Sequence, residues 1–221
     1  MPAFAALLLF LVLAVLSPLL FGNLMLASLG KLHLSPSAAL ALVFAIFIGG
    51  LINIPVAKLR RSKNVSSNPL AIYGLSNFWP ERTATETIIA VNVGGCLIPV
   101  GLAIYQIAYL VSSHPGALAV GFVGCLVNVV VCYYLARPVK GIGIAMPALV
   151  SPAISALLAI LLASEAAPPV AFVIGVVGPL VGADLLHLKE IESVEAGVAS
   201  IGGAGTFDGI VLSGIIAAYL A

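Results

Sequence analysis

Two aspartates, Asp184 and Asp208, are the residues of this sequence best suited to do chemistry. They are the only aspartates among 221 residues, and each lies inside an apolar stretch. An aspartate at membrane depth costs about 2.5 kcal/mol or more, so its presence there points to a function. Two such carboxylates close together share one proton, which leaves one base and one acid at neutral pH. That pair can activate a water and polarise a carbonyl, as in aspartic proteases.

The composition places these aspartates in a membrane protein. Apolar residues make up 62% of the chain and charged residues 8%, whereas about 25% of residues are charged in soluble domains. The net charge of +1 excludes nucleic-acid binding through a basic face. The three cysteines, Cys96, Cys125 and Cys132, lie in apolar segments and are odd in number, which excludes a disulfide-stapled secreted module.

Seven apolar runs are long enough to cross a bilayer as helices. A spanning helix needs about 20 residues, and a helix leaves few backbone groups unpaired in lipid. The sequence therefore predicts an all-α, polytopic transmembrane bundle that forms a single domain over residues 1–221. The predicted helices cover residues 3–25, 38–57, 87–111, 117–136, 143–163, 169–188 and 203–221.

The basic residues set the predicted orientation, because Lys and Arg collect in cytoplasmic loops. With helices alternating in direction, eight of the nine basic residues fall on one side, and only Lys31 falls on the other. We therefore expect a multi-pass protein of the cell membrane with a cytoplasmic N-terminus and a C-terminus outside. The one long loop, 58–86, is then cytoplasmic, as a solvated linker or, alternatively, as a gate.

Residue counting gives the two aspartates a common depth. At 1.5 Å per residue, Asp184 and Asp208 lie roughly 6 to 8 Å below the cytoplasmic surface. Their helices are consecutive and can pack antiparallel, so the carboxylates can meet. Asn53 and Asn92 fall near the same layer, and Asn128 lies deeper. Glycines and prolines crowd this half, and interrupted helices at membrane depth face protein or water. We therefore expect a hydrated cavity open to the cytoplasm.

Two groups of motifs resemble known families. GGAGTFDG at residues 202–209, with Asp184 in the preceding helix, resembles the presenilin and signal peptide peptidase group of intramembrane aspartyl proteases. In that group the two aspartates lie on consecutive helices, the second after Gly-x-Gly, and a Pro-Ala-Leu element lies beside them. Pro147-Ala148-Leu149 matches this element.

The second resemblance covers most of the chain from Ile52 onward. It is to a family of small prokaryotic membrane proteins of unassigned function, and it carries no activity with it. The motifs that support it are INIPV, VNVGGCLIPVG, MPALVSP, GADLLHLKEI and GAGTFDGI.

The leading prediction is an intramembrane protease that hydrolyses transmembrane peptide substrates near the cytoplasmic face. Asp184 and Asp208 are its catalytic pair, and no cofactor or metal is expected. Five residues are predicted to bind the substrate backbone, the glycines by allowing it to approach closely. They are Pro147, Ala148, Leu149, Gly203 and Gly205.

Three alternatives use the same residues differently. In a transporter or channel, the aspartates would couple to protons or cations, with Asn53, Asn92 and Asn128 as oxygen ligands, and a homo-oligomer would complete the scaffold. A divalent-metal site would combine the aspartates with His187 and Glu190, although a solvated loop explains those two residues better. In a structural role, the aspartates would cap helices or pair with Lys or Arg.

Overall fold

The computed structural model describes residue 16 and residues 19–67, 82–139, 143–191 and 198–221. Within these ranges the protein is mostly helical, and three helices are long and apolar enough to cross a membrane. The chain is therefore a membrane protein. The long helices are Val93–Ser113, Pro115–Leu135 and Ser164–Glu190; shorter apolar helices are Leu19–Gly30, Pro36–Gly49, Val150–Leu162 and Gly209–Leu220.

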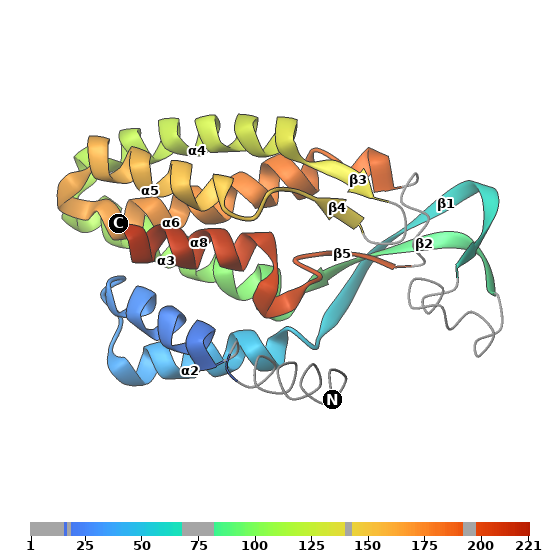
Figure 1. Ribbon diagram of the computed structural model, residues 1–221, viewed down its shortest axis with the longest axis horizontal. Helices are drawn as coiled ribbons and strands as arrows, with labels where there is room; N and C mark the ends of the chain where they lie inside the picture. The colour runs from blue at the N-terminus through green and yellow to red at the C-terminus, as the bar shows by residue number, and fades with distance from the viewer. Residues whose placement is uncertain (1–15, 17–18, 68–81, 140–142, 192–197) are drawn as a thin grey trace, which may run out of the picture.

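Helix α6 (Ala167–Val177) is the centre of the bundle. Nearly all of its residues are buried, and it contacts α3 (Ile98–Ser113), α4 (Pro115–Leu135), α5 (Val150–Leu162) and α8 (Gly209–Leu220). Figure 1 shows these helices running side by side, with α2 (Pro36–Gly49) below them. Gly175 lets α6 approach α8 closely, because a Cβ there would lie 2.7 Å from the carbonyl oxygen of Ser213.

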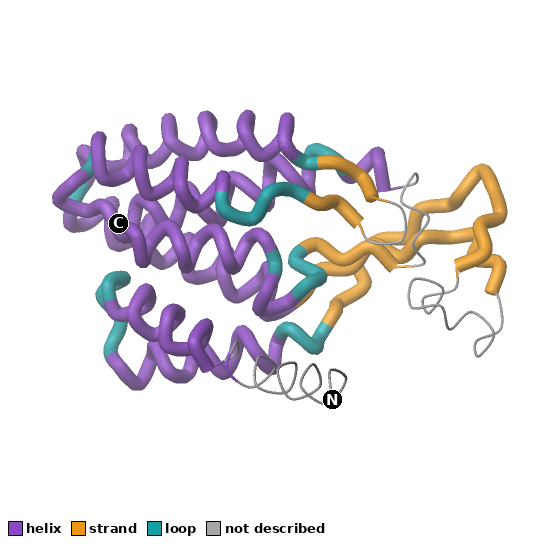
Figure 2. Tube along the Cα trace, in the orientation of Figure 1, coloured by secondary structure: helices purple, strands orange, loops and turns teal. Residues whose placement is uncertain are grey.

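The described strands gather at one end of the helices, and the C-terminus lies at the other end (Figures 1 and 2). One sheet has the order β1-β2-β5, with β1 antiparallel and β5 parallel to β2. The second sheet is the antiparallel pair β3-β4. The strands are β1 (Asn53–Ser67), β2 (Arg82–Asn92), β3 (Arg137–Val139), β4 (Gly143–Ala145) and β5 (Val198–Ile201).

The purely helical prediction is therefore wrong at this end of the molecule. The helix predicted over 38–57 ends at Gly49, and the helix predicted over 87–111 begins at Val93. Residues 53–67 and 82–92 form the antiparallel strands β1 and β2 instead. Pro55 lacks the N–H that a continuing helix needs, and the four β-branched residues among 87–91 favour a strand. In the predicted loop 58–86, residues 58–67 and 82–86 thus belong to these strands, and residues 68–81 lie outside the described part.

Other predicted helices differ mainly at their ends. The first extends to Gly30, five residues beyond its predicted end, and residues 1–15 are outside the described part. The fifth begins at Val150, because Gly143–Ala145 is a strand. The last begins at Gly209, after an irregular segment. Seven helices were predicted to cross the membrane; the described ranges contain seven apolar helices, of which three are long enough to do so.

A buried polar cluster ties α4 to its neighbours. The side-chain amide nitrogen of Asn128 has three acceptors within hydrogen-bond distance for its two N–H groups, which are Ser151 Oγ at 2.9 Å, Ser155 Oγ at 3.0 Å and the carbonyl oxygen of Ile174 at 3.0 Å. Ser151 in turn lies 2.6 Å from Ser213 Oγ on α8. All four polar side chains are buried. The cluster therefore links four helices through polar groups that are hydrogen-bonded to one another.

Replacing Asn128 with Ala should destabilise this bundle by about 1 kcal/mol, because the hydrogen bonds of its two N–H groups, at about 0.6 kcal/mol each in a membrane interior, are lost. Thermal unfolding in detergent measures the effect. Ser112→Ala is the matched control, since Ser112 is exposed and bonds only to carbonyls of its own helix. Equal unfolding temperatures for the two variants would contradict a stabilising role for the cluster.

Candidate functional site

Asp184 and Asp208 line one cavity of about 300 Å³ at the strand-bearing end of the bundle. Strands β4 and β5 and the loop containing Gly203 and Ala204 form its other walls. Both aspartates are half-buried. Since one molecule takes up about 30 Å³ in liquid water, the cavity has room for roughly ten water molecules. The two acids therefore share a space that can hold water next to both of them.

Asp184 is carried by a π-helical segment, η5 (Gly178–Leu185), that continues α6. The amide of Leu186 donates to the carbonyl of Val181, which is the i→i+5 pattern of a π-helix. The wider turn changes the direction of Asp184 relative to a continued α-helix. The backbone amide of Gly202 interacts with the Asp184 carboxylate. A local departure from α-helix thus helps to direct this side chain.

Asp208 is the N-cap of α8. One of its carboxylate oxygens accepts from the amide of Ile210 at 3.0 Å, and the other accepts from the amide of Ala204 at 3.3 Å. The positive end of the helix dipole favours the charged form of a carboxylate at this position. Asp208 therefore caps a helix, as the structural alternative predicted. Each oxygen has a second lone pair, so capping leaves the carboxylate able to accept further hydrogen bonds.

The two carboxylates are close enough to interact electrostatically. The buried thiol of Cys96 lies within electrostatic range of both. Cys96 belongs to the π-helical turn η3 (Val93–Leu97) that precedes α3. The sequence placed this cysteine in an apolar segment and gave it no part in the site. Its place in VNVGGC, next to an asparagine and two glycines, was the available signal that it borders the site.

Glycines let the backbone of η3 pass directly against the loop that leads to Asp208. A Cβ on Gly95 would overlap the carbonyl oxygen of Gly202, and a Cβ on Gly202 would lie 2.6 Å from the carbonyl carbon of Gly95. Gly202 has a φ of +70°, a conformation that glycine adopts without strain. This contact, which we call the glycine junction, fixes the Gly202 amide beside Asp184.

Asn53 and Asn92 join the three-stranded sheet to the helices. Asn92 donates to the carbonyl of Gly50 at 2.8 Å and to Asn53 Oδ1 at 3.1 Å, and its own Oδ1 accepts from Gly95 N–H at 2.7 Å. Asn53 Oδ1 also accepts from Ser200 Oγ at 2.6 Å, which ties β1 to β5. These two amides hold the cavity wall in place, and neither residue is among those that line the cavity.

The predicted substrate-binding residues fall in different places. Gly203 lines the cavity. Gly205 is buried behind it, against Gly50, with a φ of +61°. Pro147, Ala148 and Leu149 form an exposed turn before α5 and are not part of the lining. The third predicted polar residue, Asn128, belongs to the buried cluster described above.

The residues considered for a metal site are not grouped around the aspartates. His187 Nδ1 lies 3.0 Å from the carbonyl oxygen of Gly182, and its ring packs on Tyr133 with centroids 4.8 Å apart. Among the described residues, no group of three His, Cys, Asp or Glu side chains is arranged to hold a metal ion. The chemistry of this cavity therefore has to be argued from its two carboxylates.

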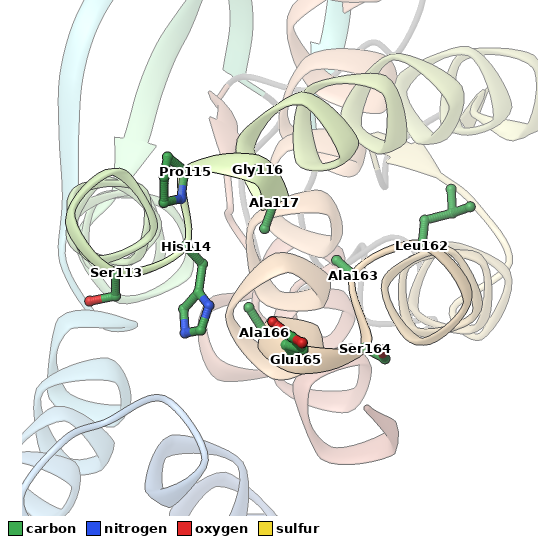
Figure 3. A pocket seen from close by; sticks show the side chains of 10 residues that line it. All are labelled: Ser113, His114, Pro115, Gly116, Ala117, Leu162, Ala163, Ser164, Glu165 and Ala166. Carbon is green, nitrogen blue, oxygen red and sulfur yellow. The ribbon is translucent and has the colours of Figure 1, made fainter.

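A second cavity, of about 470 Å³, lies between the α3–α4 turn and the turn after α5. Figure 3 shows the side chains of His114 and Glu165, which come from these two turns. Both turns are at the helix ends opposite the strands (Figure 1). Glu165 is thus an exposed acid in a different cavity, which makes it a control for charge removal away from the aspartates.

The fold and the site define a helical membrane protein in which two aspartates on successive helices share a cavity beside a small sheet. The chain belongs to the family described as protein of unknown function (DUF1614), which matches residues 47–220. The matched region runs from the end of α2 through α8 and contains both aspartates. Comparison with curated proteins and with solved structures gave no match.

Proposed function

We propose that this protein is a multi-pass protein of the cell membrane that hydrolyses peptide bonds of transmembrane substrates near the cytoplasmic face, with Asp184 and Asp208 as the catalytic pair. One observation carries the proposal: both carboxylates line a single cavity large enough for water. The collection of Lys and Arg on one side favours a cytoplasmic strand end. The resemblance of GGAGTFDG to the motif of presenilin-type proteases agrees with the same chemistry.

In the proposed reaction, the ionised carboxylate removes a proton from a water held between the two aspartates. The water oxygen bonds to the carbonyl carbon of the substrate, while the protonated carboxyl hydrogen-bonds to the carbonyl oxygen. The C–N bond then breaks, and the leaving nitrogen takes up a proton from the pair. The amides of Ala204 and Ile210 keep the Asp208 carboxylate oriented throughout.

Proton or cation coupling is the alternative that the same carboxylates allow. Its other expected ligands were the side-chain oxygens of Asn53, Asn92 and Asn128. None of these three asparagines is among the residues that line the cavity of the two carboxylates. Hydrolysis needs only the two carboxylates and a water, so this placement favours the proteolytic proposal.

Cleavage of a labelled single-span peptide by the purified protein in lipid vesicles tests the proposal. Mass spectrometry should find new termini at one membrane-proximal end of the peptide. Asp208→Asn should lower the rate by about 10³-fold, the middle of the range for losing an acid–base group. Asparagine caps helices as well as aspartate does, so this variant should keep α8 intact. Glu165→Gln, in the other cavity, should cleave at the wild-type rate.

Two results would overturn the proposal. The first is cleavage by Asp208→Asn at the wild-type rate, which would restrict Asp208 to capping. The second is a wild-type protein that leaves a panel of such peptides intact but moves protons or Na⁺ across the vesicle membrane, with the flux lost in Asp208→Asn. That result would assign the carboxylates to transport.

A further inference from the structure

Two cavities adjoin at the end of the bundle away from the strands. The first is the polar cavity between the α3–α4 turn and the turn after α5. The second is an apolar groove of about 520 Å³ between α3 and α4, with α6 and η5 as its floor. Ala117 lines the polar cavity, and the next residue, Leu118, lines the groove. Ala166 and Val170, one helical turn apart, divide between them in the same way. The groove therefore begins where the polar cavity ends.

The groove is open to the membrane along one side. Phe122 and Leu126 on its α4 rim are exposed, and so is Ile107 on its α3 rim. Val173 on the floor is buried, and Val177 is half-buried. The residues that line the groove are all apolar. Its natural occupant in a bilayer is therefore a hydrocarbon chain.

The length of the groove matches one leaflet. Its lining on α4 runs from Leu118 to Val129, a rise of about 16 Å at 1.5 Å per residue. Half of a bilayer core of about 30 Å is about 15 Å. The polar cavity lies at the ends of the same helices, where lipid headgroups lie. One acyl chain can thus follow the groove while its headgroup stays in the polar cavity.

The polar cavity offers partners for both charges of a zwitterionic headgroup. His114 and Glu165 line it, together with the hydroxyl-bearing Ser113 and Ser164 (Figure 3). The His114 side chain makes no capping hydrogen bond to α4, so its ring can donate to a phosphate oxygen, as can the two hydroxyls. The Glu165 carboxylate can accept from an ammonium group. With about 470 Å³, the cavity has room for roughly fifteen water molecules, enough for a small headgroup.

We propose that the two cavities bind one phospholipid with a phosphoethanolamine headgroup, from the leaflet on the side away from the strands. One acyl chain lies in the groove, the phosphate contacts His114 and the serines, and the ammonium contacts Glu165. Lipid tails are as apolar as the groove, so the preference for this lipid comes from its headgroup. No step of the proposed peptide cleavage uses this site, which lies at the opposite end of the helices from the aspartates.

Native mass spectrometry of the full-length protein in detergent tests the site. The probes are phosphatidylethanolamine, phosphatidylcholine and phosphatidylglycerol with the same acyl chains. The first should bind about tenfold more tightly than the other two, because a trimethylated ammonium has no N–H to donate and a glycerol headgroup has no cation. Equal affinities for the three lipids would overturn the proposal.

Filling the groove tests where the lipid lies. A Cβ on Gly121 would lie 3.9 Å from Val170 Cγ1, an ordinary contact, so Gly121→Leu fills space in the groove without forcing backbone apart. This variant should bind phosphatidylethanolamine at least about tenfold more weakly. Gly101→Leu is the matched control, because Gly101 is exposed on α3 outside the groove lining and nothing lies within 4 Å of its Cβ position. Equal binding by the two variants would contradict a seat in the groove.

Photolabelling of the wild-type protein locates the chain without any substitution. A phosphatidylethanolamine with a diazirine near the end of one acyl chain should label the neighbourhood of Val129 and Val181, where the groove ends. Labels found by peptide mapping only on helices outside the groove would overturn the proposal, even if the lipid is retained.

Discussion

Replacing Asp184 with Asn should reduce peptide-bond hydrolysis by about 10³-fold or more, equivalent to about 4 kcal/mol of transition-state stabilisation. The substitution keeps the size of the side chain and removes only its ability to carry a negative charge or exchange the shared proton. The Gly202 amide can still face an oxygen of the new side chain. Folding should therefore be preserved, and the loss should appear in the rate of cleavage under single-turnover conditions.

The double variant tests more directly whether the two aspartates act as one catalytic pair. Because two carboxylates that share one proton act as a unit, Asp184→Asn with Asp208→Asn should be about as slow as either single variant. Independent sites would multiply their effects, giving a loss of about 10⁶-fold if each costs about 10³-fold. Rates that multiply in this way would contradict a shared catalytic pair. Unfolding temperatures of all three variants show whether stability contributes to the losses.

The helices could be predicted from the sequence, and the strands could not. Apolar length identifies a segment that fits a membrane, but an apolar run does not by itself distinguish a strand from a helix. Residues 87–92 were therefore read as the start of a helix. Their strand state depends on β1 and on the parallel neighbour β5, which comes more than one hundred residues later in the chain. No local pattern records that pairing.

The sequence predicted that the two aspartates lie close together, but it did not predict which groups hold them. Helical rise placed Asp184 and Asp208 at one depth on successive helices, and both line one cavity. Backbone amides of Ala204, Ile210 and Gly202 surround the pair, and amide contacts of this kind leave no trace in residue types. The three asparagines were polar residues at membrane depth and looked like cavity lining. Their partners are backbone groups, serines and, for Asn53 and Asn92, each other, which only the fold brings within reach.

The second large effect is expected from a substitution at the glycine junction, which should disturb the assembly of the site. Gly95→Ala should destabilise the protein by on the order of 3 kcal/mol, because the new Cβ would overlap the Gly202 carbonyl, and backbone cannot rotate away as a side chain can. The loop from Gly202 to Asp208 would have to shift. Even the fraction that folds should therefore lose peptide cleavage.

Gly101→Ala is the matched control for Gly95→Ala. Gly101 lies on α3, a little further along the same long helix, and nothing stands within 4 Å of the place where its Cβ would be. Alanine there should be neutral or stabilise the protein by up to about 1 kcal/mol, since glycine is the poorer helix former. Thermal unfolding and cleavage rate should separate the two variants. A Gly95→Ala protein as stable and active as Gly101→Ala would mean that the η3 turn and the Gly202 loop can part without cost, and Asp184 would then need another means of being held.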